Sequence, residues 1–326
     1  MTLPYTTELD AITDDYYMAD GKAATDIHFN SSFLLNWFMK QQKGLWKRPG
    51  GGIYMVTHFM FDQGVSGAYE KADPLSSDDR EILNAARFLI KHYYSNATIY
   101  RTDELANSGG AELVDLVTNK VSNAQESITS DLATDLYGDS GDTAKYLTGL
   151  KTLTSETTSA TYGGVAETDL LSSDGSYNWE GKTDSDAKVI SLDLFRDMAT
   201  ACKLKDGKMG KIDLVTMPEA LFNPVLSILQ LQQIYTEAKE TVDAGFTGVK
   251  FEGKKLVADD YCPSANMFGV NSNFVGFGIH KNGYFVRDKW RKLDGPMGRT
   301  MKILWDGNLI CNNRKAHIRY SSVTAS

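Results

Sequence analysis

Cysteine and histidine are scarce in this chain of 326 residues. The three cysteines, Cys202, Cys262 and Cys311, are far apart and form no C-x-x-C pair. The five histidines are scattered, and none is spaced with a carboxylate or another histidine as metal ligands are. This pattern argues against a disulfide framework or a zinc site and favours buried, reduced thiols. We therefore expect neither a metal nor a cofactor.

Long hydrophobic runs are also missing. The longest apolar cluster, residues 33–39, includes Asn36 and is far shorter than the roughly 20 residues that cross a bilayer. The N-terminus lacks a basic stretch followed by an apolar core, so we expect no secretory signal and no membrane association.

The sequence has no familiar catalytic motif. A nucleotide-binding G-x-G-x-x-G, a P-loop, an H-E-x-x-H pair and a G-x-S-x-G elbow are all missing. Residues 64–67, Gly-Val-Ser-Gly, lack the spacing of a nucleophile elbow. The pairs Asp78-Asp79 and Asp259-Asp260 are adjacent, and neighbouring side chains on a strand point in opposite directions. We expect a protein that is not an enzyme, with an α+β hydrolase as the remaining enzymatic alternative.

One long amphipathic helix is predicted over residues 109–137. Its apolar residues recur every three or four positions, which places them on one helical face. They are Leu113, Leu116, Val117, Val121, Ala124, Ile128, Leu132 and Leu136. At 1.5 Å per residue the helix would be roughly 40 Å long. Its single stripe fits a spine lying along a sheet, and it fits a long core helix of an α+β enzyme equally well.

Two segments before this helix cannot bury their apolar residues alone. Residues 1–26 show little periodicity and predict an extended arm, followed by a short helix over 26–41 that is apolar nearly all round. Such a helix needs cover from a partner or from a distant part of its own chain. Strand residues 53–61, a polar stretch over 62–79 and a return through Ala86, Phe88 and Ile90 predict a projecting hairpin. An isolated hairpin is barely stable in water, so this one must lie on something.

The remaining sequence predicts a mixed α+β fold. Residues 139–188 form a long polar loop in which acids outnumber bases, whereas bases outnumber acids over 281–319. Helices are expected over 191–204 and after Pro218. Strands are expected over 98–102, 212–217, 249–258 (bent at Gly253), 267–270 and 275–280. Asn282-Gly283 and Asp306-Gly307 predict two hairpin turns, one joining 275–280 to 284–287 and one joining 301–304 to 308–312.

The order of these segments, with three short motifs, resembles the major capsid proteins of tailed bacteriophages. Residues 249–263 read VKFEGKKLVADDYCP, residues 267–271 read MFGVN, and residues 304–314 read LWDGNLICNNR. The Tyr162-Gly-Gly-Val segment, with Trp179 beyond it, is similar to a loop of the same family. The resemblance covers essentially the whole chain, and its motifs are structural rather than catalytic.

This resemblance implies an icosahedral phage shell fold with five parts. Residues 1–48 would form an N-terminal arm, 49–91 an extended β-hairpin loop, 92–143 a peripheral domain with the spine helix at about 109–137, 144–288 an axial domain, and 289–326 the returning strands of the peripheral domain. The family often carries a scaffolding segment ahead of the arm. None is visible here, so scaffolding is either a separate protein or a segment missing from this chain.

The implied function is a major capsid protein that self-assembles into pentamers and hexamers of an icosahedral shell around double-stranded DNA. Its partners would be other copies of itself, DNA bound non-specifically, and separate scaffolding, portal and possibly decoration proteins. It would assemble in the host bacterial cytoplasm and reside in the virion. Alternatives are an encapsulin-type nanocompartment shell, which normally begins with a short helix rather than a long arm, and less readily a tail or decoration protein.

The residues expected to function are contact residues. Candidate inter-subunit contacts are Phe33, Trp37, Phe38, Tyr54, Phe59, Tyr69 and Lys71, and a possible basic inner face comprises Lys40, Lys43, Lys47 and Arg48. The basic cluster equally suits ordinary solvated surface.

Some members of the family join neighbouring subunits by a lysine–asparagine isopeptide bond. Lys71 and the asparagines Asn308, Asn312 and Asn313 supply the residue types. However, Glu70 and Asp73 favour the charged, non-nucleophilic form of Lys71, and no glutamate between residues 306 and 319 can act as the base. We expect a purely non-covalent shell.

Overall fold

The computed structural model describes residues 32–40, 49–71, 73–106, 116–156, 161–173, 175–202, 211–232, 236–237 and 248–325. These residues fall into two compact units. The first unit comprises the described parts of 92–131 and 282–306, and the second those of 31–91, 132–281 and 307–326. The five-part division expected from the sequence stays a prediction.

The second unit is built on a seven-stranded mixed sheet with the order β6-β17-β12-β8-β11-β10-β9. These strands are β6 (Thr183–Asp184), β17 (Ile318–Tyr320), β12 (Met267–Val270), β8 (Leu214–Met217), β11 (Lys254–Ala258), β10 (Gly248–Phe251) and β9 (Thr236–Glu237). Every residue of β8 and β12 is buried, so neither strand alternates apolar and polar residues, and Thr216 is the one polar residue in them. The tight turn from β10 to β11 uses Glu252 and Gly253, both with positive φ.

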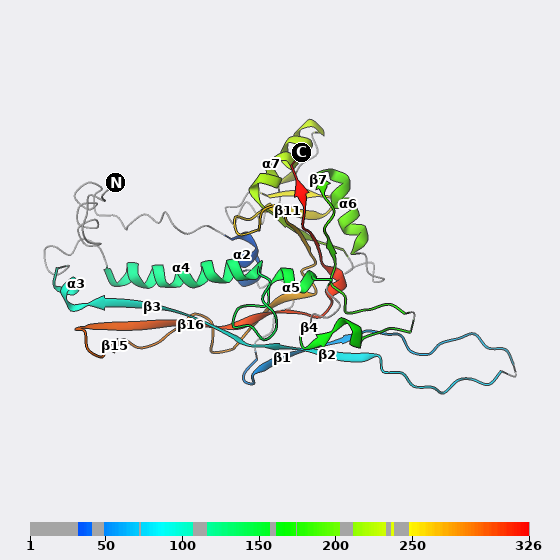
Figure 1. Ribbon diagram of the computed structural model, residues 1–326, viewed down its shortest axis with the longest axis horizontal. Helices are drawn as coiled ribbons and strands as arrows, with labels where there is room; N and C mark the ends of the chain where they lie inside the picture. Colours follow the sequence, from blue (N-terminus) through cyan, green and yellow to red (C-terminus); the bar gives the residue numbers. More distant parts are fainter. Residues whose placement is uncertain are drawn as a thin grey trace. The chain divides into compact units, whose positions relative to one another are not determined.

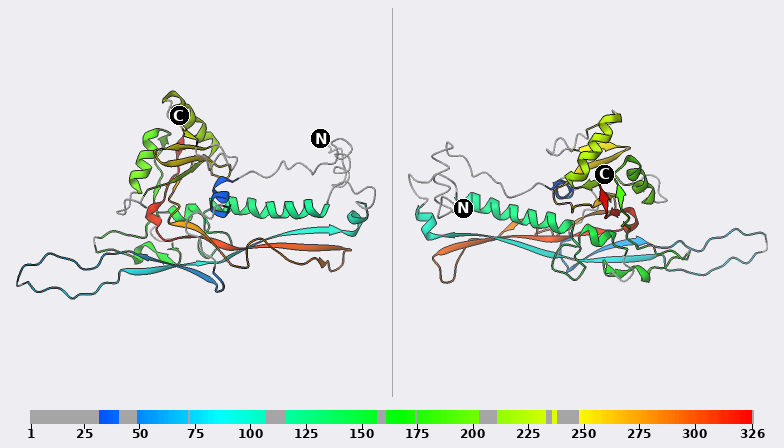
Figure 2. Two further views of the ribbon diagram at one scale, coloured as in Figure 1. Left: turned by 180° about the vertical axis from the view of Figure 1, so that it is seen from behind. Right: turned by 45° about the horizontal axis from the view of Figure 1, so that its top comes forward.

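Two amphipathic helices, α6 (Leu192–Ala201) and α7 (Glu219–Gln232), cover one face of this sheet (Figures 1 and 2). The Ser191 hydroxyl caps α6 by accepting a hydrogen bond from the Leu194 amide at 3.2 Å. Their apolar faces join one core with the sheet, which includes Phe195, Met198, Leu221, Val225, Val215, Leu256 and Ile318.

The opposite face is covered by α2 (Phe33–Lys40) and by the residues at the end of α4. A buried carboxylate holds the start of α2, because Asp259 accepts hydrogen bonds from the Ser32 hydroxyl at 3.0 Å and from the Leu34 amide at 2.9 Å. Burial raises the pKa of Asp259, and these hydrogen bonds oppose that rise. Phe38 meets Phe277 edge to face with ring centroids 5.8 Å apart. The helix that is apolar all round is therefore covered by a distant part of its own chain.

In the first unit, β3 (Lys91–Tyr100), β14 (Val286–Arg287) and β15 (Arg291–Lys292) all pair with the long strand β16 (Gly298–Cys311). The helix α4 (Leu116–Leu136) lies along these strands (Figures 1 and 2). It falls inside the expected range 109–137, of which residues 109–115 lie outside the described part of the chain. Residues 101–106 form the short helix α3 (Arg101–Ala106), so the strand expected over 98–102 was wrong at its end.

Both predicted turns of the C-terminal third were wrong. Asp306-Gly307 lies inside β16, where Leu304 pairs with Val286 and Gly307 pairs with Ile279. The strands β13 (Val275–Ile279) and β14 therefore each pair with β16, one after the other along its length, and do not form a hairpin together. Asn282-Gly283 lies in the segment that connects them. The Gly283 carbonyl accepts a hydrogen bond from the Asp306 amide at 2.8 Å, and a Cβ at position 283 would lie 2.6 Å from the Asp306 Cβ. Glycine is needed there for close approach, not for a hairpin.

The polar stretch 139–188 is also more structured than expected. It contains α5 (Leu150–Thr154), the hairpin of β4 (Thr161–Tyr162) and β5 (Val165–Ala166), a 3₁₀ turn (Glu167–Asp169), β6, and β7 (Lys188–Val189), which pairs with β18 (Val323–Thr324). Gly163 and Gly164, both with positive φ, turn the hairpin. Elements of two to five residues are too short to show a period, so the sequence could not reveal them.

Candidate inter-subunit surface of the hairpin

The strands β1 (Tyr54–Met60) and β2 (Leu83–Leu89) form a two-stranded antiparallel hairpin, in which residues 61–82 connect the two strands (Figure 1). Its register runs from the pair Tyr54–Leu89 to the pair Met60–Leu83. Successive side chains of a strand face opposite sides, so the hairpin has an inner face, carrying Met55, Thr57, Phe59, Ala86 and Phe88, and an outer face. The two strands predicted from the sequence are confirmed.

The inner face is anchored on other parts of the second unit, to which the hairpin also belongs, by ring packing and one hydrogen bond. The Thr57 hydroxyl donates to the Cys311 carbonyl at 3.2 Å. Phe59 stacks on Trp179 with ring centroids 4.0 Å apart and an interplanar angle of 9°, and Phe88 meets the Tyr162 ring at 5.2 Å. These contacts supply the support that an isolated hairpin lacks.

Polar contacts fix the point at which the loop leaves β1. Asp62 accepts hydrogen bonds from the Ser172 and Ser173 hydroxyls, both at 2.9 Å. The hydrogen bond from the Gln63 amide is the largest cause that lowers the pKa of Asp62 to about 2; burial opposes it, and the hydrogen bonds from Ser172 and Ser173 lower the pKa further. The Asn178 side-chain amide donates to the Phe61 carbonyl at 2.5 Å. The base of the loop is therefore held, while the described residues 63–71 and 73–80 are exposed.

The outer face and the loop expose large apolar side chains. Met60 is 71% exposed and its partner Leu83 is 62% exposed. The other exposed apolar residues of this surface are Ile53, Tyr54, Val56, Val65, Tyr69 and Leu75. Isolated surface apolar residues are ordinary, but several of them on one hairpin and its loop are typical of an interaction site.

The structure separates the candidate contact residues into two groups. Tyr54, Tyr69 and Lys71 are exposed on the hairpin and its loop. The expectation that Phe33, Trp37 and Phe38 lie on a contact surface needs correction, because each is at most 4% exposed and is covered by its own chain.

Phe59 is likewise partly covered, by Trp179. The side chain of Lys40, and all of Lys43, Lys47 and Arg48, lie outside the described residues.

Sequence reasoning missed Met60 and Leu83. The available signal was the apolar character of both faces of residues 54–60, since a strand that packs on one side alone should alternate apolar and polar residues. Tyr54, Val56 and Met60 occupy the face that a monomer would make polar.

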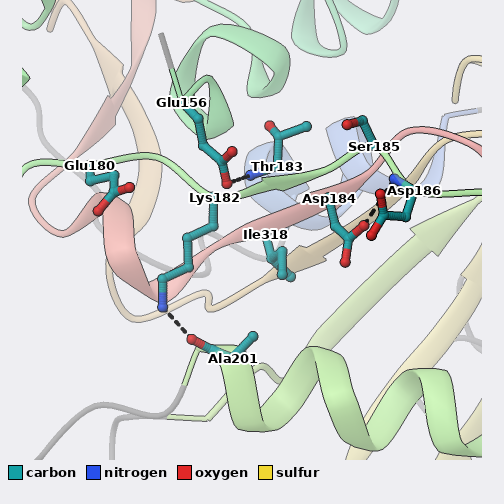
Figure 3. Close-up of a pocket in the computed structure, with 9 residues that line it drawn as sticks. All are labelled: Glu156, Glu180, Lys182, Thr183, Asp184, Ser185, Asp186, Ala201 and Ile318. Carbon is teal, nitrogen blue, oxygen red and sulfur yellow. Dashed lines mark hydrogen bonds between the residues drawn. The ribbon is translucent and has the colours of Figure 1, made fainter. Parts of the chain in front are cut away.

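A pocket of about 480 Å³ lies elsewhere in the second unit and is shown in Figure 3. It is lined by Glu156, Glu180, Lys182, Thr183, Asp184, Ser185, Asp186, Ala201 and Ile318. Glu156 accepts a hydrogen bond from the Thr183 amide at 2.6 Å, and Lys182 donates to the Ala201 carbonyl (Figure 3). Asp184 pairs with Lys188. These contacts hold charged side chains of the pocket in place.

In the described part of the chain, no group of three or more histidine, cysteine or acidic side chains is placed to bind a metal ion. None of the helices in the described ranges is both long and apolar enough to cross a membrane.

Asn308, one of the three asparagines considered for a covalent cross-link, is buried and hydrogen-bonded inside the fold. Asn308 is 1% exposed, and its side-chain amide donates to the Leu89 carbonyl at 2.9 Å and to the Thr148 hydroxyl at 3.2 Å. Its side-chain oxygen accepts from the Thr148 amide at 3.0 Å. A lysine of another molecule would have to break this buried network to reach it.

Comparison with known proteins gives structural matches alone: no protein-family model and no characterised protein sequence matches the chain. The chain in the structure described as "Cyanophage A-1(L) capsid asymmetric unit" is similar with a TM-score of 0.68 and 13% identity, over 93% of this chain and 96% of that one. A chain from the capsid of a native GTA particle has a TM-score of 0.59 and 9% identity, over 98% and 100%. A chain of the holo-SrpI encapsulin complex from Synechococcus elongatus PCC 7942 has a TM-score of 0.55 and 9% identity, over 100% and 98%.

These likenesses extend over nearly the whole length of each chain, so they concern the complete fold. The mixed helix-and-sheet architecture is that of phage capsid proteins, as the order of elements predicted.

Proposed function

We propose that this protein is a non-enzymatic shell subunit that self-assembles into pentamers and hexamers of a closed icosahedral capsid. The capsid fold supports the proposal, and one observation about this chain carries it. The hairpin β1–β2 is anchored through its inner face while its outer face and loop expose apolar side chains that the described part of its own chain does not cover. Such a surface is a liability in a monomer and an interface element in a lattice.

Within the proposal, the shell is that of a tailed bacteriophage and encloses double-stranded DNA. Scaffolding, portal and possibly decoration proteins are separate partners. Assembly takes place in the host bacterial cytoplasm, and the mature location is the virion. Repetition of one modest contact over many copies stabilises a closed shell without any single strong bond.

The experiment compares wild-type protein with the double variant Met60→Glu/Leu83→Glu. The two side chains face each other across the hairpin and are exposed, so the variant should fold with a change in unfolding free energy within about 0.5 kcal/mol. Burying a large apolar side chain at a subunit contact contributes about 1.5–3 kcal/mol to the free energy of association. A carboxylate in its place would have to lose its hydration, so the variant should weaken every copy of the contact in the shell.

We expect shells from wild-type protein near neutral pH and moderate salt, measured by negative-stain imaging and sedimentation, and dispersed subunits from the double variant. Val189→Glu, at an exposed apolar position on β7, is the matched control and should assemble. A wild-type protein that stays monomeric at every concentration would refute the shell, and normal shells from the double variant would refute the role of the hairpin.

The encapsulin-type nanocompartment is the second candidate, because an encapsulin chain matches this fold over its whole length. The two shells differ in their contents. Purified particles that protect nuclease-resistant DNA support the phage capsid, whereas particles that enclose a co-purifying enzyme and no DNA support the nanocompartment.

A further inference from the structure

The part of the first unit that carries β14, β15 and the start of β16 is strongly basic. Residues 286–302 hold six basic and two acidic side chains, which gives this stretch a net charge of +4 in a chain whose net charge is −8. All six basic residues are exposed, and together they are called the basic patch: Arg287, Lys289, Arg291, Lys292, Arg299 and Lys302.

Strand pairing decides which of these side chains share a face of the sheet. Lys292 on β15 pairs with Arg299 on β16, and Arg287 on β14 pairs with Ile303 on β16. Residues 299 and 303 are an even number of positions apart on β16, so they lie on one face, and the residues directly opposite them lie on that face too. Arg287, Lys292 and Arg299 therefore form a row that is about 13 Å long.

The row brings like charges together. Lys292 and Arg299 lie directly opposite each other, an arrangement that destabilises a strand pair. The Arg299 guanidinium also lies 5.6 Å from the centre of the Trp290 ring, a contact that restrains it. The carboxylate of Asp288 is directed to another member of the patch, Arg291, at 2.8 Å. An anion bound between Lys292 and Arg299 would remove the repulsion between them.

The composition of the patch favours nucleic acid over an acidic protein as the source of that anion. Half of the patch is lysine, which is depleted in protein–protein interfaces. Protein–DNA interfaces are much more positively charged, and lysine and arginine contacts with phosphate supply essentially all of their non-specific affinity. Duplex DNA carries one phosphate charge per about 1.7 Å of its axis, so a row of this length faces several phosphates.

We propose that the basic patch binds the phosphate backbone of duplex DNA without sequence preference. The inference rests on the proposed function, in which the shell encloses such DNA, and it adds the surface of the subunit that the DNA contacts. Arg287, Lys292 and Arg299 contact phosphates directly, and the other members of the patch add long-range attraction.

The test is fluorescence anisotropy of a short labelled duplex titrated with dilute full-length subunits. Lys292→Gln/Arg299→Gln removes two charges from the row. Lys145→Gln/Lys250→Gln, at exposed positions of the second unit, removes the same number of charges and is the matched control. Lys292→Arg/Arg299→Lys keeps both charges, and urea unfolding shows that each variant is folded.

We expect the wild-type protein, the control and the charge-keeping variant to bind the duplex with affinities within about twofold of one another. Lys292→Gln/Arg299→Gln should bind at least about tenfold more weakly at about 50 mM salt, and its affinity should fall less steeply with added salt, by about one unit of logarithmic slope for each lost phosphate contact. Two duplexes of unrelated sequence should bind equally well.

Wild-type subunits that bind no duplex at low salt would overturn the proposal. Equal losses in the row variant and the control would also overturn it, because net charge alone would then explain the binding. A poly-glutamate peptide that binds the patch as tightly as the duplex would show an acidic protein to be the partner instead.

Negative-stain imaging of the same variants separates this inference from the proposed function. A wild-type protein that forms no shells refutes the proposed function, whatever the subunits bind. Normal shells together with unchanged duplex affinity in Lys292→Gln/Arg299→Gln refute the DNA surface alone.

Discussion

A buried arginine beside the hairpin anchor offers the sharpest test of how this fold is held together. Arg314 is 1% exposed, and its guanidinium donates to four backbone carbonyls. Nε reaches Leu153 at 2.9 Å, one terminal nitrogen reaches Trp179 at 2.9 Å, and the other reaches Ser155 at 2.8 Å and Thr152 at 3.4 Å.

Three of these carbonyls belong to the C-terminal end of α5, where backbone carbonyls lack helical partners and the helix dipole is negative. The guanidinium also lies 5.0 Å from the centre of the Tyr162 ring. Burial lowers the pKa of Arg314, but an arginine side chain keeps its charge in proteins.

We expect Arg314→Met to lower the free energy of unfolding by about 3–5 kcal/mol. A hydrogen bond from a charged donor contributes about 1.5–3 kcal/mol, and each carbonyl left unsatisfied in the interior costs about 1–3 kcal/mol. These terms overlap because the four bonds share one side chain, which keeps the total near the cost of breaking a buried ion pair. Arg314→Lys retains the charge but not the planar set of donors, and should lose about half as much.

Urea unfolding of dispersed subunits, followed by tryptophan fluorescence, measures the difference. Arg291→Met is the matched control, because the Arg291 side chain is 72% exposed and forms a surface ion pair with Asp288 at 2.8 Å, worth about 0–1 kcal/mol. Gly181→Ala should disturb the same hydrogen bonds without changing Arg314, since the new Cβ would lie 2.8 Å from a guanidinium nitrogen. A loss for Arg314→Met no larger than that for Arg291→Met would refute the reasoning.

Three further expectations follow from other parts of the structure. Burial lowers the pKa of His317 from 6.5 to about 3, so the stability that the neutral imidazole contributes is complete above pH 6.5. As the pH falls toward 3, about 1.4 kcal/mol of unfolding free energy is lost per pH unit. His317→Gln should therefore reduce the change of the urea midpoint between pH 6.5 and 5, and His58→Gln, at an exposed position, should leave that change as it is. Gly163→Val should destabilise by more than about 1 kcal/mol in thermal unfolding, because φ is +65° there and the new Cβ would lie 2.7 Å from that of Ala86, whereas Gly175→Ala, also at positive φ but in open space, should cost less. Boiled particles should run as a single band near the 36.1 kDa subunit in denaturing detergent, and multimers that survive reductant would show that Lys71 or another residue is covalently linked.

The sequence by itself determined the features that depend on local pattern. The strands predicted over 212–217 and 267–270 and the amphipathic helix predicted over 191–204 are confirmed, since side-chain direction follows directly from backbone geometry. The order of these elements, together with three short motifs, resembles phage capsid proteins, and that resemblance predicted the fold.

Only the tertiary structure decided which segments meet. Asp306-Gly307 has the residue pair of a hairpin turn but lies in a strand, because pairing with both β13 and β14 outweighs a local turn preference. The exposed outer face of the hairpin, with Met60 opposite Leu83, depends on which side of a two-sided apolar strand the chain covers. Arg314 looks like a surface residue in a basic stretch, and it is buried because four carbonyls from segments more than 130 positions away converge on it. Such convergence is a property of packing, which no local period encodes.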